Sequence, residues 1–156
     1  MAEFIVSDSL KQLIGSTVGP IITKVEEGAI QRYAKAVGDE NPLYTDVEYA
    51  AQSRWGRLMA PPGFAGWAIS PGHDLFHLVE KLIAAGAPRG NLDGGVELEF
   101  LAPVGAGDIL SALSKISHLE GRETKMGPTL VTTVETTFTN QRGAKVMITR
   151  NTFLNF

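Results

Sequence analysis

Apolar residues recur at helical spacing in the first part of the chain. Between Glu27 and Val37 they fall three or four positions apart, at Ile30, Tyr33, Ala34 and Val37. This is the spacing of one face of an amphipathic helix. Two glutamates begin this stretch and a glycine follows it, as is favoured at the two ends of a helix. We therefore predict a helix over residues 27–37, with its apolar stripe packed on a sheet.

The next segment combines turn residues with a second, shorter helical pattern. Residues 39–42, Asp-Glu-Asn-Pro, predict a turn because Asp and Asn hydrogen-bond their own backbone. Residues 46–53 predict a short helix that has Asp46 or Thr45 as its N-terminal cap.

The middle of the chain is interrupted by two consecutive prolines, Pro61 and Pro62. They exclude a helix at that point, because each fixes φ and removes a backbone donor. Residues 64–69 then predict a buried helical segment that lies in, or leads into, the central helix of the fold. Residues 75–85 predict a further helix.

The second half of the chain alternates apolar and polar residues, as half-buried strands do. Val96, Leu98 and Phe100 alternate with Glu97 and Glu99. Similar stretches predict strands that begin near Val96, Asp108, Pro128 and Ala144, after one short β-branched strand at Ile21–Val25. A hairpin turn is expected at residues 140–143. These elements predict an α+β fold, an antiparallel sheet of about five strands wrapped around a helix.

Composition limits the number of domains and the classes of partner. With 156 residues, 44% of them hydrophobic, the whole chain 1–156 is predicted to be one domain. The 14 basic and 17 acidic residues are spread along the chain and give a net charge of −3, so we expect no nucleic-acid partner. No stretch approaches the ~20 apolar residues of a membrane span, and the N-terminus lacks a secretory signal pattern. We expect no membrane contact and a cytoplasmic location.

Cysteine and histidine are too scarce for several kinds of chemistry. The chain has no cysteine, which excludes a thiolate nucleophile and a disulfide framework. Its histidines are His73, His77 and His118. The first two, four positions apart, would share a helix face and could bind a metal with a third ligand, but none is evident, so no metal site is predicted. His118 is expected to be exposed near a strand end.

Four segments together resemble one protein family. They are residues 33–44 (YAKAVGDENPLY), 60–64 (APPGF), 99–108 (EFLAPVGAGD) and 136–143 (TTFTNQRG). In this order they resemble the MaoC-like (R)-specific enoyl-CoA hydratase and 3-hydroxyacyl-ACP dehydratase family. The similarity is to its N-terminal-type members, which resemble a fungal fatty-acid-synthase dehydratase domain. The resemblance covers residues 18–154 and implies a hot-dog fold that forms a homodimer, or a heterodimer with a sister hot-dog subunit.

The resemblance also implies a reaction. Members of this family add water reversibly to a trans-2-enoyl thioester and form the (R)-3-hydroxyacyl thioester. The acyl group is carried on coenzyme A or on acyl carrier protein, and no other cofactor is expected. Such a reaction needs a base for water, an acid for the α-carbon, and donors for the thioester oxygen as negative charge develops on it.

At two positions the chain departs from the catalytic members of the family. Asp39 and Asn41 match the motif, but Tyr44 stands where those members carry the histidine that holds water together with the aspartate. A phenol, with a pKa near ~10, is a poor base at neutral pH, although it can donate a hydrogen bond. Pro61 and Pro62 align with a His-Gly step whose glycine N–H serves the oxyanion, and proline has no N–H. Asp39, Asn41 and Tyr44 are the candidate catalytic residues, with turn and packing roles as the alternatives.

The candidate substrate-binding residues are Arg57, Pro62, Gly63, Phe64 and Trp67. Arg57, with Arg54, is suited to the phosphates of a pantetheine carrier, or else the two belong to a solvated helix. Phe64 and Trp67 are expected to fill the concave face of the sheet, which lines the acyl tunnel in relatives.

Three functions remain open at this point. The first is a subunit without the complete Asp/His site, paired with a sister hot-dog chain that has it. The second is a self-sufficient homodimeric hydratase that uses Asp39 with Tyr44. The third is another hot-dog activity, either a thioesterase or a non-catalytic acyl-thioester-binding module. The two departures from the motif favour the first.

Overall fold

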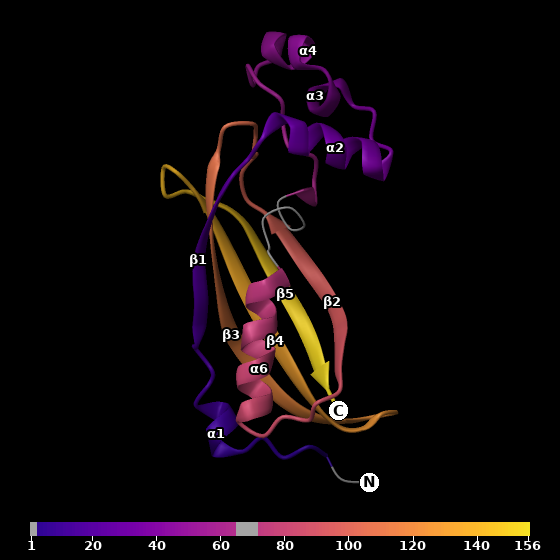
Figure 1. Ribbon diagram of the computed structural model, residues 1–156, viewed down its shortest axis with the longest axis vertical. Helices are drawn as coiled ribbons and strands as arrows, with labels where there is room; N and C mark the ends of the chain where they lie inside the picture. The colour runs from indigo at the N-terminus through magenta and orange to yellow at the C-terminus, as the bar shows by residue number, and fades with distance from the viewer. Residues whose placement is uncertain (1–2, 65–71) are drawn as a thin grey trace.

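The computed structural model of the chain describes residues 3–64 and 72–156, with the backbone alone at residues 72–74. A long sheet carries one helix, α6 (Gly72–Ala84), on its face. The helices within residues 27–52, which we call the helical group, lie beyond one end of the sheet (Figure 1). Both chain termini lie toward the opposite end (Figure 1). Within these described ranges, no helix is long and apolar enough to cross a membrane.

Five strands form the sheet, in the order β1-β3-β4-β5-β2, and each neighbouring pair is antiparallel. The strands are β1 Thr17–Lys24, β2 Asn91–Phe100, β3 Ile109–Thr124, β4 Gly127–Asn140 and β5 Lys145–Asn155. The helices are α1 Asp8–Lys11, α2 Glu27–Val37, α3 Pro42–Thr45, α4 Val47–Gln52 and α6 Gly72–Ala84. The predicted α+β architecture, an antiparallel sheet with a helix against it, is confirmed.

The core has one cluster under α6 and another at the end where the short helices lie. In the first, Leu78 and Leu82 of α6 are fully buried against residues of β3, β4 and β5 such as Ile116, Leu130 and Phe153. The second cluster joins the helical group to the ends of the strands; its members include Ile30, Leu58, Phe64, Leu110 and Phe138. Burial of these apolar side chains therefore fixes both the helix and the helical group relative to the sheet.

The other face of the sheet carries a row of charged side chains. On β5, Arg150 Nε lies 3.2 Å from Glu135 Oε2 of β4, and Arg150 Nη1 lies 3.1 Å from Glu99 Oε2 of β2. Lys115 Nζ of β3 lies 3.9 Å from Glu135 Oε1. Cross-strand pairs of opposite charge stabilise a sheet modestly. The sheet is thus amphipathic, with α6 on its apolar face.

Three strands are longer than the sequence pattern predicted, and each extends beyond an irregularity in its pairing. β2 begins at Asn91 rather than near Val96, with a register shift between Asp93 and Gly95. β1 begins at Thr17 rather than Ile21, and β3 continues to Thr124, past a shift next to His118. The prediction that His118 lies near a strand end is therefore wrong. A bulge adds one residue and reverses the alternation on which the prediction depended.

Most of the predicted helices are confirmed. α2 has the predicted bounds, and Gly38 ends it in the left-handed conformation at φ 72°. Its expected position is wrong: it lies across the end of the sheet rather than on a face (Figure 1), and Val37 of its apolar stripe is exposed. Asp46 caps α4, and α6 matches the helix expected at residues 75–85. The predicted helical segment at residues 64–69 falls outside the described residues after Phe64.

Strand β2 forms an open edge of the sheet. All ten of its residues are exposed, and its edge opposite β5 has no partner strand within the described chain. Val96, Leu98 and Phe100 pair with Asn151, Thr149 and Met147 of β5. Directly paired residues point to the same face, and Met147 is fully buried, so these three apolar side chains lie on the core face and are nevertheless 52%, 40% and 52% exposed.

Candidate functional site

The turn between α2 and α3 is held by the side chains of Asp39 and Asn41. Asp39 Oδ1 accepts a hydrogen bond from the N–H of Asn41 at 3.1 Å, and Asn41 Oδ1 accepts one from the N–H of Leu43 at 3.0 Å. Asn41 is the N-cap of α3, and Pro42 occupies the first helical turn, where its missing N–H costs nothing. Asp39 and Asn41 therefore both stabilise the turn, which is the alternative role that the sequence left open for them.

Tyr44 follows on α3 and packs half-buried against the core. Burial raises the pKa of its phenol, and the negative charge of Asp39 raises that pKa further. Since an unperturbed phenol already titrates near ~10, Tyr44 is protonated at neutral pH. Its hydroxyl can donate a hydrogen bond to a ligand but cannot take a proton from water.

A pocket of about 380 Å³ lies between the helical group and the end of the sheet. One wall comes from residues 43–44, 55 and 59–62, and the other from residues 100–104 with Val146. The described lining is apolar and uncharged: Leu43, Tyr44, Trp55, Met59, Ala60, Pro61, Pro62, Phe100, Leu101, Ala102, Pro103, Val104 and Val146. Such a lining fits an acyl chain better than a charged ligand.

Several backbone donors around this pocket are already used. Four N–H groups bond backbone carbonyls at 2.8–3.1 Å, those of Met59 (to Leu43), Ala60 (to Val104), and Leu101 and Ala102 (both to Val146). Pro61, Pro62 and Pro103 have no N–H. In the described lining the side-chain donors are the Tyr44 hydroxyl and the Trp55 indole N–H. Among the described lining residues, these four N–H groups are therefore not free to stabilise an oxyanion.

Four predicted substrate-binding residues follow Pro61, and three of them are among the described residues. Pro62 is exposed and belongs to the pocket lining. Phe64 is buried and packs edge-on against Tyr33, with ring centroids 5.6 Å apart. Gly63 has φ 89°, and a Cβ there would lie 2.9 Å from the Tyr33 hydroxyl, so only glycine fits. Trp67 lies outside the described residues.

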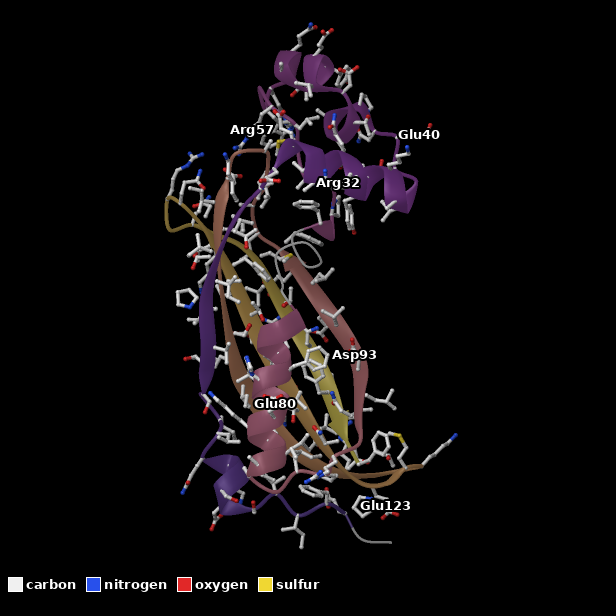
Figure 2. The ribbon with its side chains drawn as sticks, viewed as in Figure 1. Arg32, Glu40, Arg57, Glu80, Asp93 and Glu123 are labelled. Atoms are coloured by element: carbon white, nitrogen blue, oxygen red, sulfur yellow. The ribbon has the colours of Figure 1, made fainter. Side chains whose placement is uncertain are left out.

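Arg57 lies where the helical group meets the end of the sheet (Figure 2). Its two terminal nitrogens donate to the two carboxylate oxygens of Asp108 at 2.9 Å each, and Nη1 also donates to the carbonyl of Ala106 at 3.0 Å. The structure therefore brings Arg57 to Asp108, a residue that sequence reasoning had not singled out.

Asp108 is almost completely buried and well satisfied. Besides Arg57, it accepts hydrogen bonds from the N–H of Gly105 at 3.0 Å and from Gln141 Nε2 at 3.1 Å. Burial would raise the pKa of its carboxyl, but the hydrogen bonds from Arg57, Gly105 and Gln141 and the charge of Arg57 outweigh burial and lower that pKa. A stable carboxylate at this position holds Arg57 in place.

His77 and His118 lie apart from this pocket, and the side chain of His73 is outside the described residues. His77 Nδ1, on α6, lies 3.2 Å from Glu80 Oε2, and His118 is an exposed residue within β3. In the part of the chain that the structure describes, no three His, Cys, Asp or Glu side chains are grouped as a metal site would require.

Sequence reasoning missed the second wall of the pocket. Residues 100–104 were noted as part of a family motif, with Phe100 also as a strand residue, but not as candidate site residues. Trp55 and Met59 were not noted at all. The Pro103-Val104 step between a strand and a glycine-rich turn was the available signal, since it marks chain that leaves the sheet.

Comparison with known proteins places the chain among dehydratase relatives. Residues 12–149 match the family model described as FAS1-like, dehydratase domain region. A UPF0336 protein of Parafrankia sp. is 34% identical over 117 residues, which cover 71% of each chain. A UPF0336 protein of Streptomyces avermitilis is 33% identical over 97 residues, 58% of this chain and 59% of that protein. The match thus spans less than two thirds of that relative's length.

Solved structures of similar fold include two complexes and one dehydratase. A chain of the C-terminally truncated HadBC (3R-hydroxyacyl-ACP dehydratase) complex of Mycobacterium tuberculosis superposes with a TM-score of 0.74 at 22% identity, covering 97% of this chain and 100% of that one. A chain of the ChsH1-ChsH2 complex of the same organism superposes with a TM-score of 0.78 at 19% identity, covering 96% of this chain and 94% of that one. The MaoC-like dehydratase of Rhodospirillum rubrum gives 0.66 at 25% identity, with 94% and 95% covered.

Proposed function

Because the chain belongs to the FAS1-like dehydratase-region family and has the hot-dog fold of the MaoC-like hydratases and dehydratases, we propose that it is the acyl-binding subunit of such an enzyme. Its ligand is a trans-2-enoyl or (R)-3-hydroxyacyl thioester carried on coenzyme A or acyl carrier protein. A sister hot-dog chain supplies the catalytic aspartate and histidine. The family membership confirms the resemblance found in the sequence; the ligand and the division of roles are proposals.

One observation carries this proposal: the chain has an acyl-sized apolar pocket without the acid–base chemistry of hydration. Asp39 Oδ1 is bonded to its own turn, and the phenol of Tyr44 stays protonated because its pKa is raised. The Tyr44 phenol is therefore not suited to take a proton from water. Asp39 is not among the described residues that line the pocket. The pocket can hold the acyl group, and the reaction needs groups from elsewhere.

The open edge of the sheet supports a partner subunit. β2 exposes Val96, Leu98 and Phe100 on the core face, and proteins rarely leave such an apolar edge strand unpaired. Phe100 also lines the pocket, so a chain that covers β2 would extend the acyl site. The HadBC and ChsH1-ChsH2 structures are complexes of two named components, which is consistent with a sister chain at this edge.

A second candidate function is a self-sufficient hydratase. The charge of Asp39 acts on the Tyr44 phenol, so the two groups are close enough to be considered together. In that case Tyr44 would donate a hydrogen bond to the thioester oxygen or to water, and Asp39 would act as the base.

Co-expression with a candidate sister hot-dog chain that carries the intact Asp/His motif, followed by native mass spectrometry, tests the proposal. A complex of the two different chains, which hydrates crotonyl-CoA while this chain alone does not, is expected. Only homodimers, together with activity of this chain alone, would replace the proposal with the second candidate. An acyl-thioester hydrolysis product instead of a hydroxyacyl product would support a thioesterase.

A further inference from the structure

Trp55 has a fixed position at the border between the pocket and solvent. Its side chain belongs to the pocket lining and is 36% exposed. The preceding Ser53 holds the segment: its hydroxyl donates to the carbonyl of Ala50 at 2.6 Å and accepts from the N–H of Trp55 at 3.2 Å. The indole therefore forms part of the pocket's rim rather than of the core.

Arg54 lies against this indole. Its guanidinium carbon is 4.5 Å from the centroid of the Trp55 ring, and the Arg54 side chain is exposed. Arg54 is not among the lining residues, so the cation is stacked outside the pocket on a ring that belongs to the pocket.

The two arginines of this segment therefore differ in what they offer. The guanidinium of Arg57 is directed at Asp108 and Ala106. That of Arg54 makes no ion pair with another of the described side chains. A guanidinium that is stacked on an aromatic face keeps its N–H donors, at its edges, for an anion.

We propose that Arg54, held on Trp55, binds a phosphate of the pantetheine carrier as the acyl thioester enters the pocket. This inference rests on the proposed function and names the residue that contacts the carrier of the acyl group. The pocket lining is uncharged in the described residues, so the acyl group is held by apolar contact and the phosphate by the cation outside. Coenzyme A and acyl carrier protein both attach pantetheine through a 4′-phosphate, and coenzyme A carries further phosphates on its adenosine.

Isothermal titration of the full-length chain, alone and in its co-expressed complex, tests this contact with three probes. They are octanoyl-pantetheine, octanoyl-4′-phosphopantetheine and octanoyl-CoA, whose saturated chains cannot be hydrated. We expect the phosphorylated probes to bind about 10-fold more tightly than octanoyl-pantetheine, as a charge-assisted hydrogen bond provides. Arg54→Ala should remove this difference and leave octanoyl-pantetheine binding unchanged.

Arg89→Ala is the matched control, because Arg89 is exposed in the loop between α6 and β2, at the other end of the sheet. It should change none of the three affinities. If Arg54→Ala weakens the binding of both phosphorylated probes, Arg54 contacts the 4′-phosphate, which both carriers share. If it weakens the binding of octanoyl-CoA alone, Arg54 contacts a phosphate of the adenosine part, and coenzyme A is the carrier.

Two results would overturn the inference in different ways. An Arg54→Ala variant that keeps the full preference for phosphorylated probes removes the role of Arg54 and leaves the proposed function standing. Failure of all three probes to bind both the chain and its complex removes the proposed function together with the inference.

Discussion

Arg57 and Asp108, 51 positions apart in the sequence, form a two-pronged ion pair with both N–O distances at 2.9 Å. Arg57 lies between Trp55 and residues 59–62 of one pocket wall, and Asp108 follows residues 100–104 of the other wall. The pair therefore links the two walls of the pocket, and it does so at a carboxylate that is only 2% exposed.

Removal of Arg57 should destabilise the fold. In Arg57→Ala the carboxylate of Asp108 stays buried without its cation, which typically costs about 3 kcal/mol or more. Urea unfolding of the two proteins measures the difference. Arg122→Ala is the control, because Arg122 makes a similar 2.8 Å contact to Glu120 at the surface, where solvent screens the charges and an ion pair contributes little to stability. Equal effects of the two substitutions would contradict this account.

The same pair should make stability depend on pH. The pKa of Asp108 is lowered in the folded chain, so its stabilising contribution is fully present above the unfolded-state value of about 3.9 and is lost as the pH falls through the lower folded-state pKa. The gap in unfolding free energy between the wild type and Asp108→Asn should be constant from about pH 7 to pH 5 and shrink below about pH 4. A gap that does not change down to about pH 2 would contradict this.

Much of the fold could be predicted from the sequence, because alternation and helical spacing report burial directly. α2 was predicted to the residue, and three of the strands, β3, β4 and β5, begin within one position of the prediction. The missed parts are the first residues of β1 and β2, which precede a register shift, and the second half of β3, which follows one. A single extra residue changes which face each following side chain occupies, and the alternating pattern cannot reveal it.

Less of the candidate site could be predicted. The motif around Asp39 identified the turn between α2 and α3, and Pro62, a predicted substrate-binding residue, belongs to the pocket lining. The pocket itself needs residues 100–104, which approach residues 55–62 only after the sheet has formed. Arg57 was expected to bind phosphate, but it pairs with Asp108. This pairing could not be predicted, because Asp108 is distant in the sequence and nothing in the local pattern marks it as a partner.

A lysine on strand β2 should prevent assembly. Leu98 is 40% exposed in the single chain, so Leu98→Lys should fold normally. In a dimer that covers β2 the new charge would be buried unpaired, at several kcal/mol, and association should weaken by about 100-fold or more. Light scattering at micromolar concentration measures the change. Ile22→Lys on the opposite edge strand β1, where Ile22 is 62% exposed, should leave the dimer intact; the reverse result would place the interface at β1.

Restoring the family's histidine should not restore catalysis. Tyr44→His supplies a base with a pKa near ~6.5, but Pro61 and Pro62 still have no N–H for the developing oxyanion. We expect crotonyl-CoA hydration by the purified variant to remain near background. An increase of about 100-fold or more, the size of a general-base contribution, would show that the histidine alone was missing.

The central claim is that this chain binds the acyl thioester and does not carry out hydration by itself, and the purified chain's rate with crotonyl-CoA tests it most directly. We expect a rate near background for the chain alone, because a missing base and a missing oxyanion donor each typically cost ~100-fold or more, and an ordinary enzymatic rate once the sister subunit is present. Asp39→Ala, which removes the hydrogen bond to Asn41 in the α2–α3 turn and the negative charge beside Tyr44, should fold normally and leave the rate of the complex unchanged. A homodimer of this chain that hydrates an enoyl thioester at an ordinary enzymatic rate, and loses that activity in Asp39→Ala or Tyr44→Phe, would contradict the claim.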